Sequence, residues 1–216
     1  MVHPLRWQTI FFDLDGTLAD TIPLIVASYQ HAFREVRGEE IDDARARAWI
    51  GRPLLAALLE EDPERGHDLD RTYREWNLAN TERLIRRYAG VPEMLATLTA
   101  AGANLHIVTS KRRDTARLAL AGVGIDHLID VAGGLEDTVK HKPDPEPLLA
   151  AAARLGVDPA TAVYVGDATV DILAARGAGM AAIAVTWGAG EREALEATTP
   201  DTIVDTVDEL TAYLLG

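Results

Sequence analysis

Two carboxylates stand close together where a short apolar segment ends near the start of this chain. Within residues 11–18, Asp13 and Asp15 are two positions apart and Gly16 follows them. Residues i and i+2 of an extended chain point the same way, so both carboxylates face one site if the strand geometry persists. Like charges this close need a cation or a shared proton. With a metal, one carboxylate can coordinate and attack while the other titrates, as nucleophilic carboxylate chemistry requires. A bare Asp-x-Asp-Gly also fits a simple turn, but the whole run at a strand end is more specific.

A second pair of carboxylates follows another apolar segment. Residues 163–165 lead into Gly166 and Asp167, and Asp171 comes four positions later. If a helix begins here, Asp167 and Asp171 lie on one face of it. Carboxylate oxygens are hard ligands that suit Mg²⁺. The alternative for Asp171 is a charge that stabilises the first turn of the helix.

A hydroxyl pair and a lysine complete the set of candidate residues. Thr109 and Ser110 follow the apolar residues 105–108, where a hydroxyl and backbone N–H groups at a helix start suit phosphate oxygens. A plain helix cap is the alternative. Lys142, fixed by the proline that follows it, can place a compact positive charge against a phosphoryl group. Lys140 and His141 are expected to be surface residues.

Short apolar segments alternate with helical patterns along most of the chain. The predicted strands are 10–12, 105–108, 128–131, 163–165 and 181–185, and the predicted helices 92–101, 112–121, 145–155 and 171–178 each end near a glycine. This alternation predicts an α/β fold with a doubly wound, Rossmann-like parallel sheet. The candidate residues follow four of these strands, so they share one edge of the sheet, where charge and position suit phosphoryl transfer.

One connection is far too long for an ordinary crossover. About 90 residues separate the first two strands, and they hold helical patterns at 23–36, 42–50, 53–61 and 68–88. We therefore expect a core domain of residues 1–19 and 86–216 and an inserted all-helical cap domain of residues 20–85. A module inserted after the first strand lies over the crevice where open α/β sheets bind ligands, so it is placed to act as a lid.

Composition limits the partners that this chain can have. Its 216 residues carry a net charge of −13 and include no cysteine. An acidic surface repels nucleic acid and anionic membranes, so neither is an expected partner, and an anionic substrate needs a local cluster of positive charge. The absence of cysteine excludes disulfides and cysteine-based zinc sites. Residues 1–8 lack the apolar segment of a signal peptide, so we expect a cytoplasmic location.

The four segments, in this order, resemble the motifs of the haloacid-dehalogenase-like hydrolase superfamily, and within it the phosphoglycolate phosphatase group. The resemblance covers nearly the whole chain, including a helical cap. It implies that Asp13 attacks phosphorus to give an aspartyl-phosphate and that Asp15 protonates the leaving oxygen and then activates water. It also implies that Thr109 and Lys142 hold the phosphoryl oxygens. The implied Mg²⁺ ligands are Asp13, the backbone carbonyl of Asp15, Asp167 and, directly or through another ligand, Asp171.

The substrate expectations follow from the same resemblance. Residues 49–54 resemble the cap loop that reaches the substrate, so Arg52 could bind a carboxylate or a second phosphate. Gly16 and Ser110 are the other expected substrate-binding residues, and Ser110 stands where the family usually has asparagine. Asp15, in place of an aromatic residue, argues against a true dehalogenase. The implied activity is a Mg²⁺-dependent phosphatase for a small phosphorylated metabolite, with 2-phosphoglycolate first and pyrophosphate or sugar phosphates behind it.

Three other functions remain open at this point. A response-regulator receiver also uses acidic residues, a Ser/Thr and a Lys-Pro on a doubly wound sheet, but chain length, the helical insert and the pair of Asp13 and Asp15 argue against it. A phosphomutase of the same superfamily would return the phosphoryl group to a sugar. A binding protein that has lost activity conflicts with the complete set of motifs. The sequence leaves the oligomeric state open.

Overall fold

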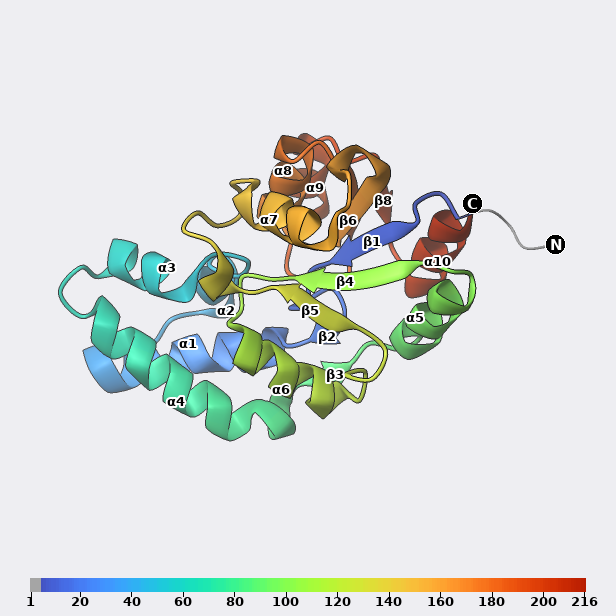
Figure 1. Cartoon of the computed structure of the whole chain (residues 1–216). Helices are drawn as coiled ribbons and strands as arrows, with labels where there is room; N and C mark the ends of the chain where they lie inside the picture. The colour runs from blue at the N-terminus through green and yellow to red at the C-terminus, as the bar shows by residue number, and fades with distance from the viewer. Residues whose placement is uncertain (1–4) are drawn as a thin grey trace.

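The computed structural model describes residues 5–216, and a parallel sheet of six strands forms its centre (Figure 1). The strands lie in the order β5-β4-β1-β6-β7-β8. They are β1 (Thr9–Phe12), β4 (Asn104–Val108), β5 (Asp130–Gly133), β6 (Ala162–Gly166), β7 (Ala181–Val185) and β8 (Thr202–Val204). The chain leaves β1 toward β4 on one side and returns to β6 on the other, so the predicted doubly wound fold is confirmed. Residues 1–4, on which the expectation about a signal peptide partly rests, lie outside the described residues.

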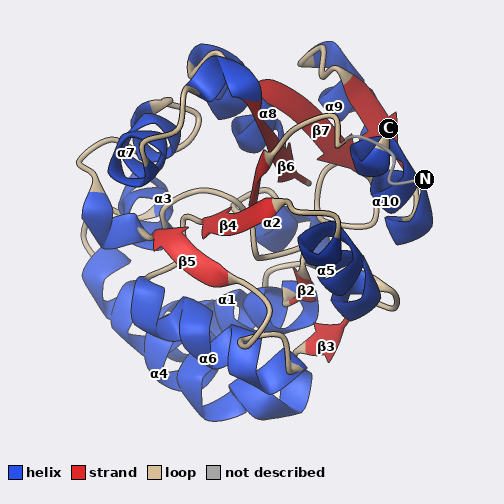
Figure 2. Ribbon diagram, turned by 45° about the vertical axis from the view of Figure 1, so that its right-hand side comes forward, coloured by secondary structure: helices blue, strands red, loops and turns tan. Residues whose placement is uncertain are grey.

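Helices cover both faces of this sheet (Figure 2). One face is covered by α5 (Val91–Ala100), α6 (Arg113–Val123) and α10 (Val207–Leu215). The other is covered by α7 (Glu146–Leu155), α8 (Thr169–Gly177) and α9 (Arg192–Ala197). Short 3-10 turns at Leu135–Asp137 and Pro159–Thr161 complete the core domain. Parallel sheets need both faces covered, which explains why their strands are apolar throughout.

The central strand β1 shows how the sequence places the first candidate residue. Ile10 and Phe12 point into one apolar core and Phe11 into the other, and all three side chains are fully buried. This alternation follows from the two-residue period of a strand. The ladder continues one residue further, because the Asp13 N–H donates to the Val165 carbonyl oxygen at 2.8 Å. Asp13 is therefore held at the carboxyl edge of the sheet by a strand packed on both sides.

Four helices lie between the short strands β2 (Ala19–Asp20) and β3 (Arg86–Arg87), which pair antiparallel. The helices are α1 (Ile22–Arg37), α2 (Asp43–Arg47), α3 (Leu54–Glu61) and α4 (Gly66–Leu84). They enclose an apolar core of their own, built around Tyr29, Phe33 and Trp49. The prediction of a helix over 68–88 was wrong at its end: α4 stops at Leu84, because the next residues pair with β2.

The C-terminal part of the chain differs most from the sequence-based prediction. Strand β8 and helices α9 and α10 were not predicted. The predicted strand 128–131 lies two residues later, as β5, because a turn in which the Leu128 N–H donates to the Ile125 carbonyl oxygen precedes it. Within residues 5–216, no helix combines the length and the apolar character that crossing a membrane would need.

Candidate active site

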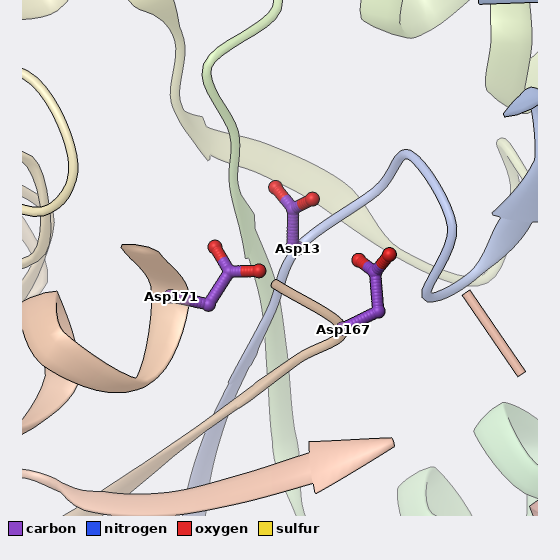
Figure 3. A group of neighbouring side chains, drawn as sticks. All are labelled: Asp13, Asp167 and Asp171. Carbon is purple, nitrogen blue, oxygen red and sulfur yellow. The ribbon is translucent and has the colours of Figure 1, made fainter. Parts of the chain in front are cut away.

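Three buried carboxylates meet at the carboxyl edge of the sheet (Figure 3). Asp13 follows β1, Asp167 follows β6, and Asp171 lies in the first turn of α8. One oxygen of each lies within 4.8 Å of one oxygen of each other residue. Asp13 is 4% exposed, and the other two are less exposed still. The sequence-based expectation that these residues come together is met by the geometry.

Lys142 is the positive charge inside this group. Its Nζ donates to Asp13 Oδ1 at 2.9 Å, to Asp171 Oδ1 at 2.6 Å and to the Tyr164 hydroxyl at 3.0 Å. The Tyr164 hydroxyl in turn donates to the Val108 carbonyl oxygen at 2.6 Å. All three hydrogens of the ammonium group are therefore used. The sequence analysis missed Tyr164, which it treated only as part of an apolar strand.

Asp167 is held in place by Thr17 and by the loop of residues 187–190, which follows β7. Its Oδ1 accepts a hydrogen bond from the Thr17 hydroxyl at 3.0 Å, and its Oδ2 accepts one from the Ala189 N–H at 2.7 Å. A Cβ atom on Gly16 or on Gly188 would lie 2.3 Å or 2.2 Å from Asp167 Oδ2. A side chain at either position would therefore force Asp167 to shift, and the loop 187–190 fixes the orientation of this carboxylate. Gly16, expected to bind substrate, makes room for this carboxylate.

The electrostatics of the group favour a bound cation. Burial raises the pKa of Asp13 to about 7, although Lys142 opposes the shift. Burial, together with the charges of Asp171 and Asp13, also holds the pKa of Asp167 well above its usual range. Burial by itself would lower the pKa of Lys142, but Asp13 and Asp171 raise it well above its usual value. One ammonium cannot neutralise three carboxylates, and hard oxygen donors at this spacing fit a divalent metal ion.

Asp15 does not belong to the three-carboxylate group and has different partners. Its Oδ1 accepts a hydrogen bond from the Thr21 hydroxyl at 2.7 Å and another from Lys111 Nζ at 2.9 Å. Its Oδ2 accepts from the same Nζ at 3.1 Å. Asp13 and Asp15 nevertheless line one cavity. Lys111 is a further residue to which the sequence analysis gave no role of its own.

Thr109 and Ser110, the two hydroxyl residues after β4, have partners in different parts of the molecule. Thr109 is buried, lines the cavity, and accepts a hydrogen bond from the Lys111 N–H at 3.2 Å. Ser110 donates to the Gly51 carbonyl oxygen at 3.0 Å, in the loop before α3. Ser110 therefore joins the edge of the sheet to the helical module, and it also lines the cavity.

The cavity lies between the helical module and the core and holds about 270 Å³. From the core, the candidate residues Asp13, Asp15, Thr109 and Ser110 line it; from the module, so do Tyr29, Trp49, Arg52, Tyr73 and Asn77. Arg52 is among these residues and forms an ion pair with Glu60. The cavity is near the lower end of the range that holds small organic ligands, so it suits a small metabolite.

Comparison with known proteins places the chain in a family. A family model described as haloacid dehalogenase-like hydrolase matches residues 10–185. The chain is a member of this hydrolase family. It is 36% identical over 205 residues to pyrophosphatase PpaX of Bacillus velezensis, covering 95% of each chain, and 40% identical over 211 residues to the probable phosphatase IndB of Dickeya dadantii, covering 93% of this chain and 90% of that one. The crystal structure of a predicted phosphoglycolate phosphatase from Haemophilus somnus is similar at a TM-score of 0.84 with 27% identity, covering 96% of this chain and 98% of that one.

The buried carboxylates predict an unusual pH dependence of stability for the metal-free protein. The pKa of Asp13 rises on folding from 3.8 to about 7, so the folded state binds more protons between these values and stability falls as pH rises through this window. Asp13→Asn removes this penalty. In EDTA at pH 8 we expect the variant to be more stable than the wild type, on the order of 1–3 kcal/mol, with a smaller difference at pH 5. Denaturant unfolding at both pH values checks this, and a variant less stable at pH 8 would contradict it.

The packing around Asp167 predicts a loss of metal affinity in Gly188→Ala. The added methyl group would collide with the carboxylate, which must turn or shift with its loop. Loss of such supporting contacts typically weakens metal binding about 10–100-fold. Titration calorimetry with Mg²⁺ measures the change. Gly177→Ala is the control, because that glycine is exposed and its added Cβ meets nothing closer than Pro145 at 3.3 Å. Equal Mg²⁺ affinity in both variants would show that the loop does not hold the ligand.

Proposed function

We propose that this enzyme is a Mg²⁺-dependent phosphatase that hydrolyses a small phosphate monoester through an aspartyl-phosphate intermediate. The observation that carries the proposal is the buried contact of Asp13 with Lys142, beside two further carboxylates and a cavity of metabolite size. A carboxylate nucleophile, a metal site and a fixed ammonium group together meet the needs of phosphoryl transfer, which are position and charge stabilisation.

In this proposal, the metal ion would be held by Asp13, the backbone carbonyl of Asp15, and Asp167. When bound, the ion polarises the phosphoryl group and neutralises developing charge. Asp171 has a supporting role, because its Oδ1 accepts from Lys142 and its Oδ2 from the Ala168 N–H at 3.0 Å. Asp171 thus orients Lys142 toward Asp13. When substrate binds, a phosphoryl oxygen would replace one of the three acceptors of Lys142 Nζ, and Thr109 would bind another phosphoryl oxygen.

The reaction has two steps. A carboxylate oxygen of Asp13 attacks phosphorus, and the bond from phosphorus to the leaving oxygen breaks as that oxygen takes the proton of Asp15. Asp15 then accepts a proton from water, whose oxygen attacks the aspartyl-phosphate and releases inorganic phosphate. Asp15 suits both steps because it lines the cavity, where the leaving group lies, and its side chain is held there by Thr21 and Lys111. Residues 20–85 act as the lid, hinged at β2 and β3, and exclude bulk water when closed.

Two substrates lead the candidates. The motifs favour 2-phosphoglycolate, and a structural neighbour carries that activity in its name. Pyrophosphate is the second candidate, because relatives with 35–37% identity over nearly the whole chain are named pyrophosphatases. Both compounds carry a second anionic group next to the phosphoryl group. Arg52 and Arg74 line the cavity on the lid side, and each is paired with a carboxylate of the lid, Glu60 or Asp70.

The nucleophile and the metal are tested together. Asp13→Asn should lower the kcat for p-nitrophenyl phosphate by about a thousand-fold or more, because a carboxamide cannot form the acyl phosphate. EDTA should abolish wild-type turnover, and added Mg²⁺ should restore it. Asp68→Asn, which changes an exposed carboxylate paired with Arg71, is the control. Substantial turnover by Asp13→Asn rejects the nucleophile, and turnover that survives EDTA rejects the metal.

A panel of substrates separates the candidates. We expect higher kcat/KM for 2-phosphoglycolate or pyrophosphate than for glucose 6-phosphate, because only the first two place a second anion beside the scissile bond. Phosphate release is followed without any added sugar bisphosphate, so that activity also excludes a phosphomutase. A preference for glucose 6-phosphate would contradict the proposed substrates while leaving the phosphatase chemistry intact.

A further inference from the structure

Lys111 is held more rigidly than an ordinary loop lysine. It lies between β4 and α6, where its N–H donates to the Thr109 hydroxyl oxygen and its carbonyl oxygen accepts from the Leu135 N–H at 3.0 Å. Its side chain is 14% exposed, and its Nζ donates to both oxygens of Asp15. The ammonium group therefore has a fixed place in the wall of the cavity.

The other cations that line the cavity are paired elsewhere. Among the described residues these pairs are Arg52 with Glu60, Arg74 with Asp70, and Arg112 with Asp114. Lys111 alone in this group has a partner from the proposed catalytic set. Lys142, which contacts the proposed nucleophile, already uses its hydrogens on Asp13, Asp171 and Tyr164.

An ammonium group has three hydrogens, and Lys111 uses two of them on Asp15. In the proposed reaction Asp15 touches the leaving oxygen. Once Asp15 has given its proton to that oxygen it is negatively charged, and a carboxylate one carbon away, or a second phosphate on that oxygen, then lies close to this charge. Two anions in a partly dry cavity repel each other unless a cation lies between them. Lys111 lies beside Asp15 and has a hydrogen left to donate.

We propose that Lys111 binds the second anionic group of the substrate, next to the scissile bond, while it keeps its contact with Asp15. The proposal rests on the phosphatase function above and names the substrate class of that site: small phosphates with an adjacent carboxylate or phosphate. Lys111 thereby selects such compounds over esters of neutral alcohols. A compact ammonium group suits this task, since it can serve two anions at once.

Kinetics with three substrates test this role. Lys111→Met and Lys111→Arg are compared with the wild type on 2-phosphoglycolate, pyrophosphate and p-nitrophenyl phosphate, which carries no second anion. We expect Lys111→Met to lose about 10–100-fold more kcat/KM on the preferred anionic substrate than on p-nitrophenyl phosphate, mainly through KM. Lys111→Arg should recover part of the loss. Lys140→Met is the matched control, since Lys140 pairs with Asp144 at 3.2 Å and is 67% exposed.

Each outcome decides the proposal. A larger loss on 2-phosphoglycolate or on pyrophosphate supports it and identifies which anion Lys111 binds. Equal losses on all three substrates show that Lys111 only positions Asp15, and no loss shows that it does neither; both results overturn the proposal. Wild-type activity confined to p-nitrophenyl phosphate overturns it as well. The phosphatase function is judged separately, by wild-type hydrolysis of p-nitrophenyl phosphate and its disappearance in Asp13→Asn.

Discussion

The burial of several charges in one small volume is the constraint on which the rest of this structure depends. Asp13, Asp167 and Asp171 share that volume with one ammonium group, and all four side chains are almost completely shielded from solvent. Burial opposes ionisation, as the raised pKa values of Asp13 and Asp167 show. Such a group is stable only where the surrounding atoms supply its hydrogen-bond partners and compensate its charges. The surplus of negative charge is also what makes the place receptive to a metal ion.

That arrangement explains features far apart in the sequence. Strand β1 must be packed on both faces, because only a fixed backbone keeps Asp13 within 2.9 Å of Lys142 Nζ. Tyr164 must be a tyrosine and not simply an apolar residue, since its hydroxyl accepts a hydrogen bond from Lys142 and donates one to the Val108 carbonyl oxygen at the end of β4. Gly188 lacks a side chain because Asp167 occupies the space. Strands, loops and glycines thus serve one electrostatic task.

The sequence predicted the parts of this site that obey local rules. Strand ends followed by carboxylates, a lysine before proline, and apolar segments alternating with helical patterns were enough for the parallel sheet and for the side chains gathered at its edge. Contacts between distant residues were beyond those rules. Nothing in the chain around Tyr164 or Gly188 shows that they meet Lys142 and Asp167. Helix α4 was predicted too long because its end depends on pairing between β2 and β3, whose paired residues are 66 and 68 positions apart. The catalytic, metal-binding and substrate-binding roles given to the site residues, Ser110 and Arg52 among them, remain predictions.

The buried charges lie in the core, whereas the cavity wall is shared with the helical module. This arrangement bears on how substrate selectivity can change independently of the chemistry. The three-carboxylate group and Lys142 belong wholly to the core, whereas the cavity wall combines core residues with those of the helical module. Changes in the module can therefore alter which leaving group fits without disturbing the buried charges. Lys111 does not follow this separation, because it belongs to the core, contacts Asp15 and also lines the cavity. In the proposed reaction, a single ammonium group at that position couples recognition of the leaving group to Asp15, the residue proposed to protonate it.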